Sequence, residues 1–207
     1  MNDQLLWFAA RGSGVVSIIL LTAVTVLGLM SVVRWGRRSW PRFLTADLHS
    51  NLALLSVVFV TVHVISAILD PFAKLGITAA TIPFASSYRP LWVGLGVISL
   101  YLFVAMLVTS QLRDRIGQRT WRLVHWAAYL AWPLAVLHGI GSGSDLGAPW
   151  MLGVQGACIA VVLGALVWRI AASRDERARM RSAAAASPHV NAPFAAISTN
   201  EIGRAHV

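Results

Sequence analysis

The sequence predicts an all-α integral membrane protein, a bundle of five transmembrane helices. Three observations support this fold class. Of the 207 residues, 57% are hydrophobic and only 12% are charged, which is too apolar for an ordinary soluble domain. Five apolar stretches are each long enough to cross about 30 Å of hydrocarbon as a helix. The positive charges lie mostly between those stretches, as they do in the loops of membrane proteins.

The apolar stretches cover residues 15–33, 48–69, 91–112, 121–140 and 150–168. Backbone groups in lipid have no water to bond, so each stretch must form a helix. The first stretch is expected to be an uncleaved spanning helix, because its arginine cluster follows the apolar residues. A signal peptide carries its positive charges in front.

Basic residues alternate along the chain in a way that predicts a topology. The first and third connections and the segment after the fifth stretch are rich in arginine. The second connection has only Lys74 and Arg89, and the fourth has neither residue type. Because arginine and lysine accumulate on the cytoplasmic side, we expect an extracytoplasmic N-terminus and a cytoplasmic C-terminus. The net charge of +9 then needs no nucleic-acid partner.

Two of the apolar stretches each contain two histidines. His49 and His63 are 14 residues apart, so both leave one face of a helix, at levels about 21 Å apart. His125 and His138 are 13 residues apart, or about 20 Å along a helix axis. The second and fourth stretches run in the same direction in the predicted topology. We therefore expect His49 to pair with His125 in the cytoplasmic half, and His63 with His138 in the outer half.

Two imidazoles that face each other across a gap supply both axial ligands of a b-type haem. Zinc is the weaker alternative, because it needs further ligands and only Asp47 adds a carboxylate at either level. The single cysteine, Cys158, allows no intramolecular disulfide and is expected to pack within a helix. Packed, hydrogen-bonded histidines are the structural alternative. Four histidines in two pairs at matching depths favour haem ligation.

The spacing of 13 residues does not suit a straight helix. It turns His138 roughly 220° away from the face of His125. Pro133 lies between the two histidines and removes a backbone hydrogen bond. We therefore expect a kink or a local rewinding at Pro133 that re-aims His138.

The paired histidines carry a resemblance to a known family. HSNLALLSVVFVTVH and HWAAYLAWPLAVLH have the form H-x13-H and H-x12-H on two parallel helices. Over roughly residues 46–167 this resembles the ferric reductase-like transmembrane domain of NADPH oxidases, ferric reductases and the haem-binding membrane subunit of bacterial methionine sulfoxide reductase systems. The shorter spacing is part of the family's pattern. The resemblance implies two stacked haem b groups, with His49 and His125 at the inner iron and His63 and His138 at the outer iron.

The resemblance also implies a function, which is electron transfer across a bacterial inner or plasma membrane. Oxidases of this family continue into FAD- and NADPH-binding domains, whereas fewer than 40 residues follow Arg169 here and contain no dinucleotide-binding glycine motif. We therefore expect the electron-transfer subunit of an oxidoreductase, with any FMN or FAD on a partner. The donor would be a cytoplasmic flavoprotein or a quinol, and the acceptor an extracytoplasmic redox protein, ferric iron or oxygen. The alternatives are a quinol-oxidising cytochrome b subunit, and a non-redox scaffold or proton path that uses the histidines as relays.

The remaining segments give a domain layout. We expect a short extracytoplasmic N-terminus over 1–14, a transmembrane haem-binding domain over 15–170, and a basic, then disordered, cytoplasmic tail over 171–207. The long connection 70–90 suits a cap over the outer haem. Within it, Tyr88 and Arg89 are expected to be interface anchors rather than partners of a haem propionate. The final residues, EIGRAHV, resemble a translated sequencing adapter and are expected to be an artefact.

Overall fold

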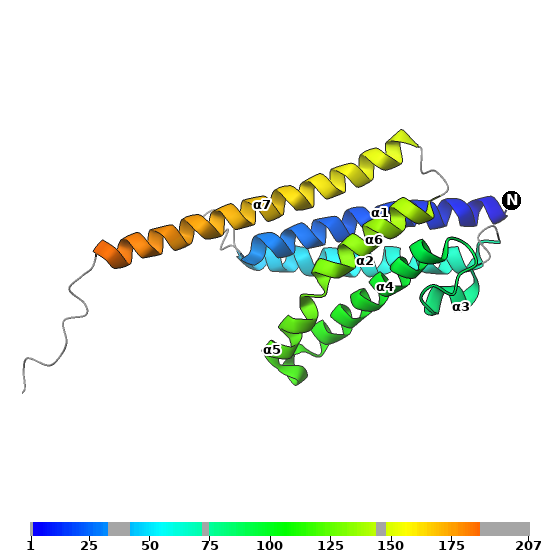
Figure 1. The fold of residues 1–207 in the computed structure, drawn as a ribbon. Coiled ribbons are helices and arrows are strands. Elements are labelled where there is room, and N and C mark those ends of the chain that lie inside the picture. Colours follow the sequence, from blue (N-terminus) through cyan, green and yellow to red (C-terminus); the bar gives the residue numbers. More distant parts are fainter. Residues whose placement is uncertain (1, 33–41, 72–74, 144–147, 187–207) are drawn as a thin grey trace, which may run out of the picture. The chain divides into compact units, whose positions relative to one another are not determined.

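The computed structural model describes residues 2–32, 42–71, 75–143 and 148–186 of the chain. All regular secondary structure in these ranges is helical, which confirms the predicted all-α class (Figure 1). The helices are α1 (Asn2–Val32), α2 (Arg42–Leu69), α3 (Gly76–Thr81), α4 (Pro90–Gln111), α5 (Arg113–His125), α6 (Ala128–Ser142) and α7 (Pro149–Ala186).

Among the described residues, four helices are long and apolar enough to cross a membrane by themselves. They contain Gln4–Ser31 of α1, Leu44–Leu69 of α2, Pro90–Gln111 of α4 and Pro149–Ala185 of α7. The pair α5 and α6 passes the same test only when it is counted as one bent span. The protein is therefore a multi-pass membrane protein, and its described residues contain four candidate spans, or five if the bent pair crosses as a unit.

Helix α2 shows how the spans divide between lipid and bundle interior. Leu54, Val58 and Ile65 are each more than half exposed, at 53%, 56% and 51%. They lie four and seven residues apart, on one side of the helix. Ser56 and Ser66 are buried on the other side, and Ser56 has no exposed surface. This arrangement, apolar outside and small polar inside, is the one expected of a helix surrounded partly by hydrocarbon.

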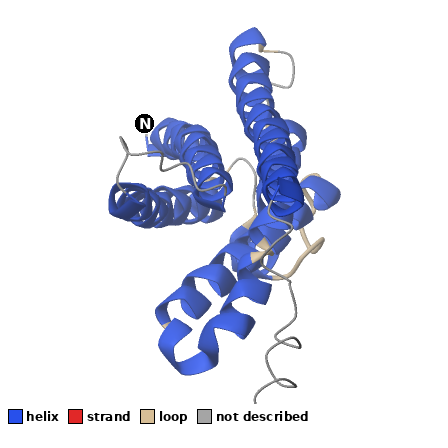
Figure 2. Ribbon diagram, turned by 90° about the vertical axis from the view of Figure 1, so that its left-hand side faces the viewer, coloured by secondary structure: helices blue, strands red, loops and turns tan. Residues whose placement is uncertain are grey.

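The helices of the first compact unit, Met1–Val167, pack in neighbouring pairs. Helix α1, which begins near the marked N-terminus, lies along α2 (Figure 2). Helix α4 lies along α6, and α1 also meets α6. Two hydrogen bonds join these pairs. Trp132 Nε1 of α6 donates to Thr22 Oγ1 of α1 at 3.0 Å, and Ser99 Oγ of α4 donates to the carbonyl of Ala131 at 2.8 Å. Such bonds between membrane helices fix which faces meet.

The break in the predicted fourth span lies elsewhere than expected. Helix α5 ends at His125, α6 begins at Ala128, and the two are bent by 45°. Pro133 lies within α6, which continues through it, so the break that redirects this span is not at the proline. Around the break, the amides of Ala127 and Tyr129 bond to carbonyls only three residues earlier. Such tight turns redirect a helix, and here the turn directly follows His125.

Both ends of the described chain are more helical than the sequence predicts. Helix α1 begins at Asn2, within the segment expected to precede the first span. Helix α7 continues to Ala186, so the start of the predicted disordered tail is helical. Alanine and arginine, which dominate this stretch, are strong helix formers. The second compact unit, Trp168–Val207, contains this end of α7. Residues 187–207, which hold the rest of the predicted disorder, lie outside the described ranges.

Candidate functional site

One stripe of α2 carries both of its histidines. His49, Ser56 and His63 follow one another at intervals of seven residues, which is close to two helical turns. Ser56 is fully buried, and its hydroxyl donates back to the carbonyl of Leu52 at 2.8 Å. The side chain between the two histidines is therefore small and makes its hydrogen bond within its own helix.

Each histidine of α2 has a histidine of the α5–α6 segment opposite it. The ring centroids of His49 and His125 are 6.3 Å apart, with the ring planes inclined by 58°. Those of His63 and His138 are 6.1 Å apart, with the planes inclined by 79°. The fold thus brings together, in space, the same two pairs that the sequence predicts from helix direction and depth.

These separations can be compared with the geometry of a haem iron that binds two imidazoles. An imidazole nitrogen lies about 2 Å from the metal ion it binds. A five-membered ring with bonds of about 1.3 Å has its centre roughly 1 Å from each ring atom. Two rings on opposite sides of one iron therefore have centres about 6 Å apart. Both observed pairs fit this requirement.

The second nitrogen of three of these rings is held by a neighbouring helix. Nδ1 of each lies within hydrogen-bond distance of a backbone carbonyl, and because a carbonyl only accepts, Nδ1 is the protonated atom. Nε2 is then the nitrogen left to bind a metal. The contacts are His63 to Ala10 O at 2.7 Å, His138 to Trp92 O at 2.9 Å and His49 to Val24 O at 3.1 Å.

His125 is the exception among the four. Its Nδ1 is buried and has no hydrogen-bond partner. The indole of Trp121, one turn earlier in α5, stacks on the imidazole with centroids 4.9 Å apart and planes inclined by 27°. Trp121 Nε1 in turn donates to Ser110 Oγ of α4 at 3.3 Å. This ring is therefore oriented by an aromatic contact and not by a backbone carbonyl.

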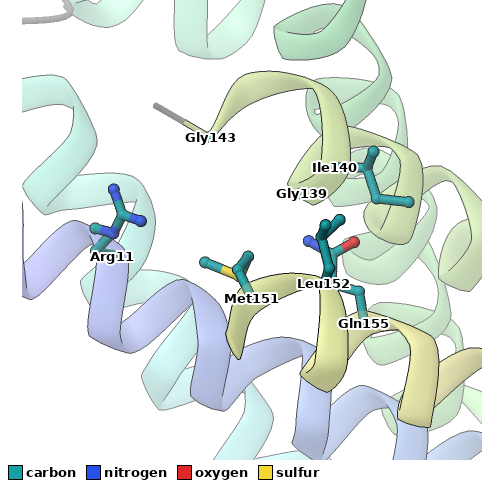
Figure 3. A pocket seen from close by; sticks show the side chains of 7 residues that line it. All are labelled: Arg11, Gly139, Ile140, Gly143, Met151, Leu152 and Gln155. Atoms are coloured by element: carbon teal, nitrogen blue, oxygen red, sulfur yellow. The ribbon is translucent and has the colours of Figure 1, made fainter. Parts of the chain in front are cut away.

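A cavity of about 300 Å³ surrounds the His63–His138 pair, with walls from α1, α2, α4, α6 and the start of α7. Two buried polar atoms on side chains that line it, Ser17 Oγ and Gln155 Oε1, have no hydrogen-bond partner. A side pocket of about 10 Å³, the space of a single water, lies between Arg11, Gly139 and Gln155 (Figure 3). A group with hydrogen-bond donors would satisfy Gln155 Oε1 here.

The described residues contain no group of three or more histidine, cysteine, aspartate or glutamate side chains arranged to hold a metal ion. A structural zinc site needs four such ligands, whereas a haem iron, held by its macrocycle, needs only the two axial histidines. The donor sets observed are pairs, which fits haem.

The connection between α2 and α4 is bound to the end of α6. Arg89 Nη1 donates to the carbonyl of Gly141 at 2.5 Å, with a longer contact to Gly143 at 3.4 Å. Tyr88 donates its hydroxyl to the carbonyl of Ser142 at 3.3 Å. These side chains satisfy carbonyls at a helix C-terminus, where a cation is also favourable. They thereby secure the helix end that follows His138.

Comparison with known families places these helices in context. The model of the family described as ferric reductase like transmembrane component matches residues 13–136, more than half of the chain. The chain belongs to this family. The match begins at residue 13, within α1, a helix that the resemblance drawn from the histidine spacing left out, and it ends two residues before His138. No curated protein and no solved structure matches the chain.

Proposed function

We propose that this ferric reductase-like protein carries electrons across the membrane through two b-type haems. The observation that carries the proposal is the separation of the two ring pairs, 6.3 Å and 6.1 Å, which suits two imidazoles on opposite faces of one iron. Family membership supports electron transfer as the activity. A bound haem would supply the one-electron chemistry. The chain would supply the imidazoles that hold it, their orientation and an apolar setting.

Two histidines per iron leave no open coordination position, so these haems would pass electrons rather than bind oxygen. His49 and His63 are separated by about 21 Å along α2. The two haems would therefore be successive stations on a path between the two sides of the membrane. We place the His49–His125 station toward the cytoplasm, because the basic connections lie at that end.

An electron path across a membrane needs a donor at one end and an acceptor at the other. We propose that a cytoplasmic flavoprotein or a membrane quinol supplies electrons, and that an extracytoplasmic redox protein, ferric iron or oxygen receives them. Any FMN or FAD would belong to the partner. In a bacterial inner membrane, residues 15–170 would form the haem-binding domain, with 1–14 outside and 171–207 in the cytoplasm.

Absorption spectroscopy of the detergent-purified protein, with haem quantified per chain, tests this proposal. Two haems per chain, each six-coordinate and low-spin, are expected. One haem per chain or a high-spin ferric spectrum would contradict the pairing. A purified protein without a Soret band would instead favour a scaffold or proton path.

Topology is tested separately with reporter fusions. A fusion at Thr78, in the connection between α2 and α4, should be active only outside the cytoplasm. A fusion at Ala186 should be active only inside. The opposite pattern would reverse the proposed direction of electron flow but would leave the haem pairs intact.

Quinol oxidation is a second candidate function, and a specific observation favours it. Ser17 Oγ and Gln155 Oε1 are buried, unpartnered and on side chains that line the cavity shared by His63 and His138. The hydroxyl groups of a quinol would supply the missing hydrogen bonds. A soluble quinol analogue should then reduce the haems, and Gln155→Leu should raise the concentration needed severalfold. Equal reduction of both proteins would count against this role.

A further inference from the structure

Three of the four histidines contact a backbone carbonyl of a neighbouring helix in the same local setting. In each case the carbonyl that contacts Nδ1 is followed, four residues later, by a glycine. These pairs are Ala10 and Gly14 opposite His63, Val24 and Gly28 opposite His49, and Trp92 and Gly96 opposite His138. The recurrence covers two different helices, α1 and α4, and both ring pairs.

The spacing has a physical reason. In an α-helix the carbonyl of one residue accepts the amide of the residue four positions later. The side chain of that later residue stands beside the carbonyl and limits access to its second lone pair. With glycine there, an imidazole from another helix can lie against the backbone and reach the carbonyl.

The space at Gly14 and Gly96 agrees with this account, whereas the space at Gly28 is less restricted. A methyl group built on Gly96 would lie 2.5 Å from Nδ1 of His138, and one on Gly14 would lie 2.9 Å from Nδ1 of His63. Both distances are too short for a real contact. A methyl group on Gly28 would lie 3.6 Å from Cε1 of His49, an ordinary contact. Gly12, in the same helix as Gly14, has nothing within 4 Å.

We propose that Gly14 and Gly96 are positioning residues for the haem ligands, and that Gly28, where a methyl group would fit, has a weaker form of the same role. Each opens one backbone carbonyl to the Nδ1–H of a histidine on another helix. This fixes the tautomer with Nε2 unprotonated, orients the ring, and makes the imidazole a stronger electron donor to iron. The proposal rests on the proposed haem function and extends it to residues that contact neither iron nor substrate.

General helix packing is the competing explanation, since small residues often line contacts between membrane helices. The two explanations differ in what a methyl group should change. Loss of packing would lower the stability of the whole bundle and affect both haems. Loss of the carbonyl contact would affect only the haem whose histidine is displaced, and would change its electronic properties.

The experiment compares Gly96→Ala, Gly14→Ala and Gly28→Ala with the matched control Gly12→Ala in the haem-loaded protein. The first two should weaken binding of the His63–His138 haem by about 10- to 100-fold, and should raise its midpoint potential because its ligand donates less. Binding and potential of the other haem should stay unchanged. Gly28→Ala should have a much smaller effect on the His49–His125 haem, and Gly12→Ala none.

A readout independent of haem completes the test. ¹⁵N NMR of histidine-labelled protein should show the Nδ1–H tautomer of His63 in the wild type and in Gly12→Ala, and its loss in Gly14→Ala. If Gly96→Ala does not fold, the comparison of Gly14→Ala with Gly12→Ala still tests the inference. Haem affinities, potentials and tautomers that are equal in these two variants would overturn the inference. A wild type that binds no haem would refute the proposed function, and the tautomer signals would then decide the inference alone.

Discussion

The surroundings of the His63–His138 pair differ from those of the His49–His125 pair. Both Nδ1 atoms of the first pair contact backbone carbonyls. Arg89 also donates a hydrogen bond to the carbonyl of Gly141, at the helix end that follows His138. In the second pair only His49 has such a contact. His125 ends α5 at the bend, where Leu123 and Trp126 are 76% and 65% exposed. The same ring spacing is thus reached with different degrees of support.

The difference shows that helix register and ligand support are separate matters. Register on parallel helices is enough to bring two imidazoles opposite each other. Holding a ring in one tautomer and orientation needs a further partner on a third element. We therefore expect the two proposed haems to differ in affinity and potential, with the one between His49 and His125 bound more weakly.

The largest effects should come from removing single imidazoles. In His49→Ala the remaining ligand, His125, has no carbonyl contact, so this haem should be lost completely. In His125→Ala the remaining ligand keeps its contact to Val24, so a five-coordinate haem should persist in part. Haem per chain and the high-spin absorption bands distinguish these results. His189→Ala, in the tail, should retain two haems. Equal loss in His49→Ala and His125→Ala would show that ring support does not matter.

The second prediction concerns Arg89, at the better supported site. Arg89→Ala removes the guanidinium that donates to Gly141 and Gly143. Hydrogen bonds that involve a charged group contribute about 1.5–3 kcal/mol, so a loss of about 2 kcal/mol in the free energy of unfolding is expected. Thermal unfolding in detergent measures it. The His63–His138 haem should dissociate faster, while the other haem should not. Arg89→Lys keeps the charge, so its free energy of unfolding should fall less. Faster loss of both haems would contradict a local role.

Sequence alone predicts much of this fold. Spans of sufficient length and apolarity can be recognised from 48–69 and 91–112, because lipid imposes one secondary structure on them. The pairing of His49 with His125 and of His63 with His138 follows from counting residues along parallel helices. These deductions need only helix geometry and charge asymmetry.

The rest depends on tertiary contacts that a pattern does not encode. Pro133 is the obvious candidate for a kink, yet the bend occurs at Trp126 and Ala127, where three-residue hydrogen bonds replace four-residue ones. The role of the positioning glycines is equally hard to predict from the sequence. Gly14 and Gly28 are 14 residues apart, as are His49 and His63. This match of spacings is a signal that would have identified them once α1 and α2 were known to be neighbours.

The third prediction concerns Trp121, at the less supported site. Trp121→Leu removes the ring stacked on His125. Aromatic pairs contribute about 0.5–1.5 kcal/mol beyond their buried area, so the haem affinity of this pair should fall by up to about tenfold. Competition with a haem-binding apoprotein would measure it. Trp121→Phe keeps an aromatic face and should restore most of the affinity. An unchanged affinity in Trp121→Leu would show that the stack does not orient His125.

The smallest expected effect tests why His125 lacks a carbonyl. Gly96 is opposite His138, and Thr109 lies thirteen residues further along α4, about 20 Å along its axis and so at the level of His125. The carbonyl four residues before Thr109 belongs to Ala105, and it already accepts the hydroxyl of Thr109 at 2.7 Å. At this level α4 therefore has a side chain where the other three sites have glycine, and a carbonyl that is already occupied.

Thr109→Gly tests whether the carbonyl of Ala105 can support His125 as other carbonyls support the other three rings. One added hydrogen bond contributes about 1 kcal/mol, and glycine in a helix costs about the same, so the stability of the protein should change little. The affinity of the His49–His125 haem should nevertheless rise severalfold and its midpoint potential should fall, because His125 becomes a stronger donor. The matched variant Thr109→Ala frees the carbonyl but keeps a methyl group beside it, so it should change the affinity and the potential of this haem less. If neither variant changes the affinity or the potential of this haem, the threonine is not what keeps His125 from the carbonyl. The 45° bend between α5 and α6 would then account for the difference between the two sites.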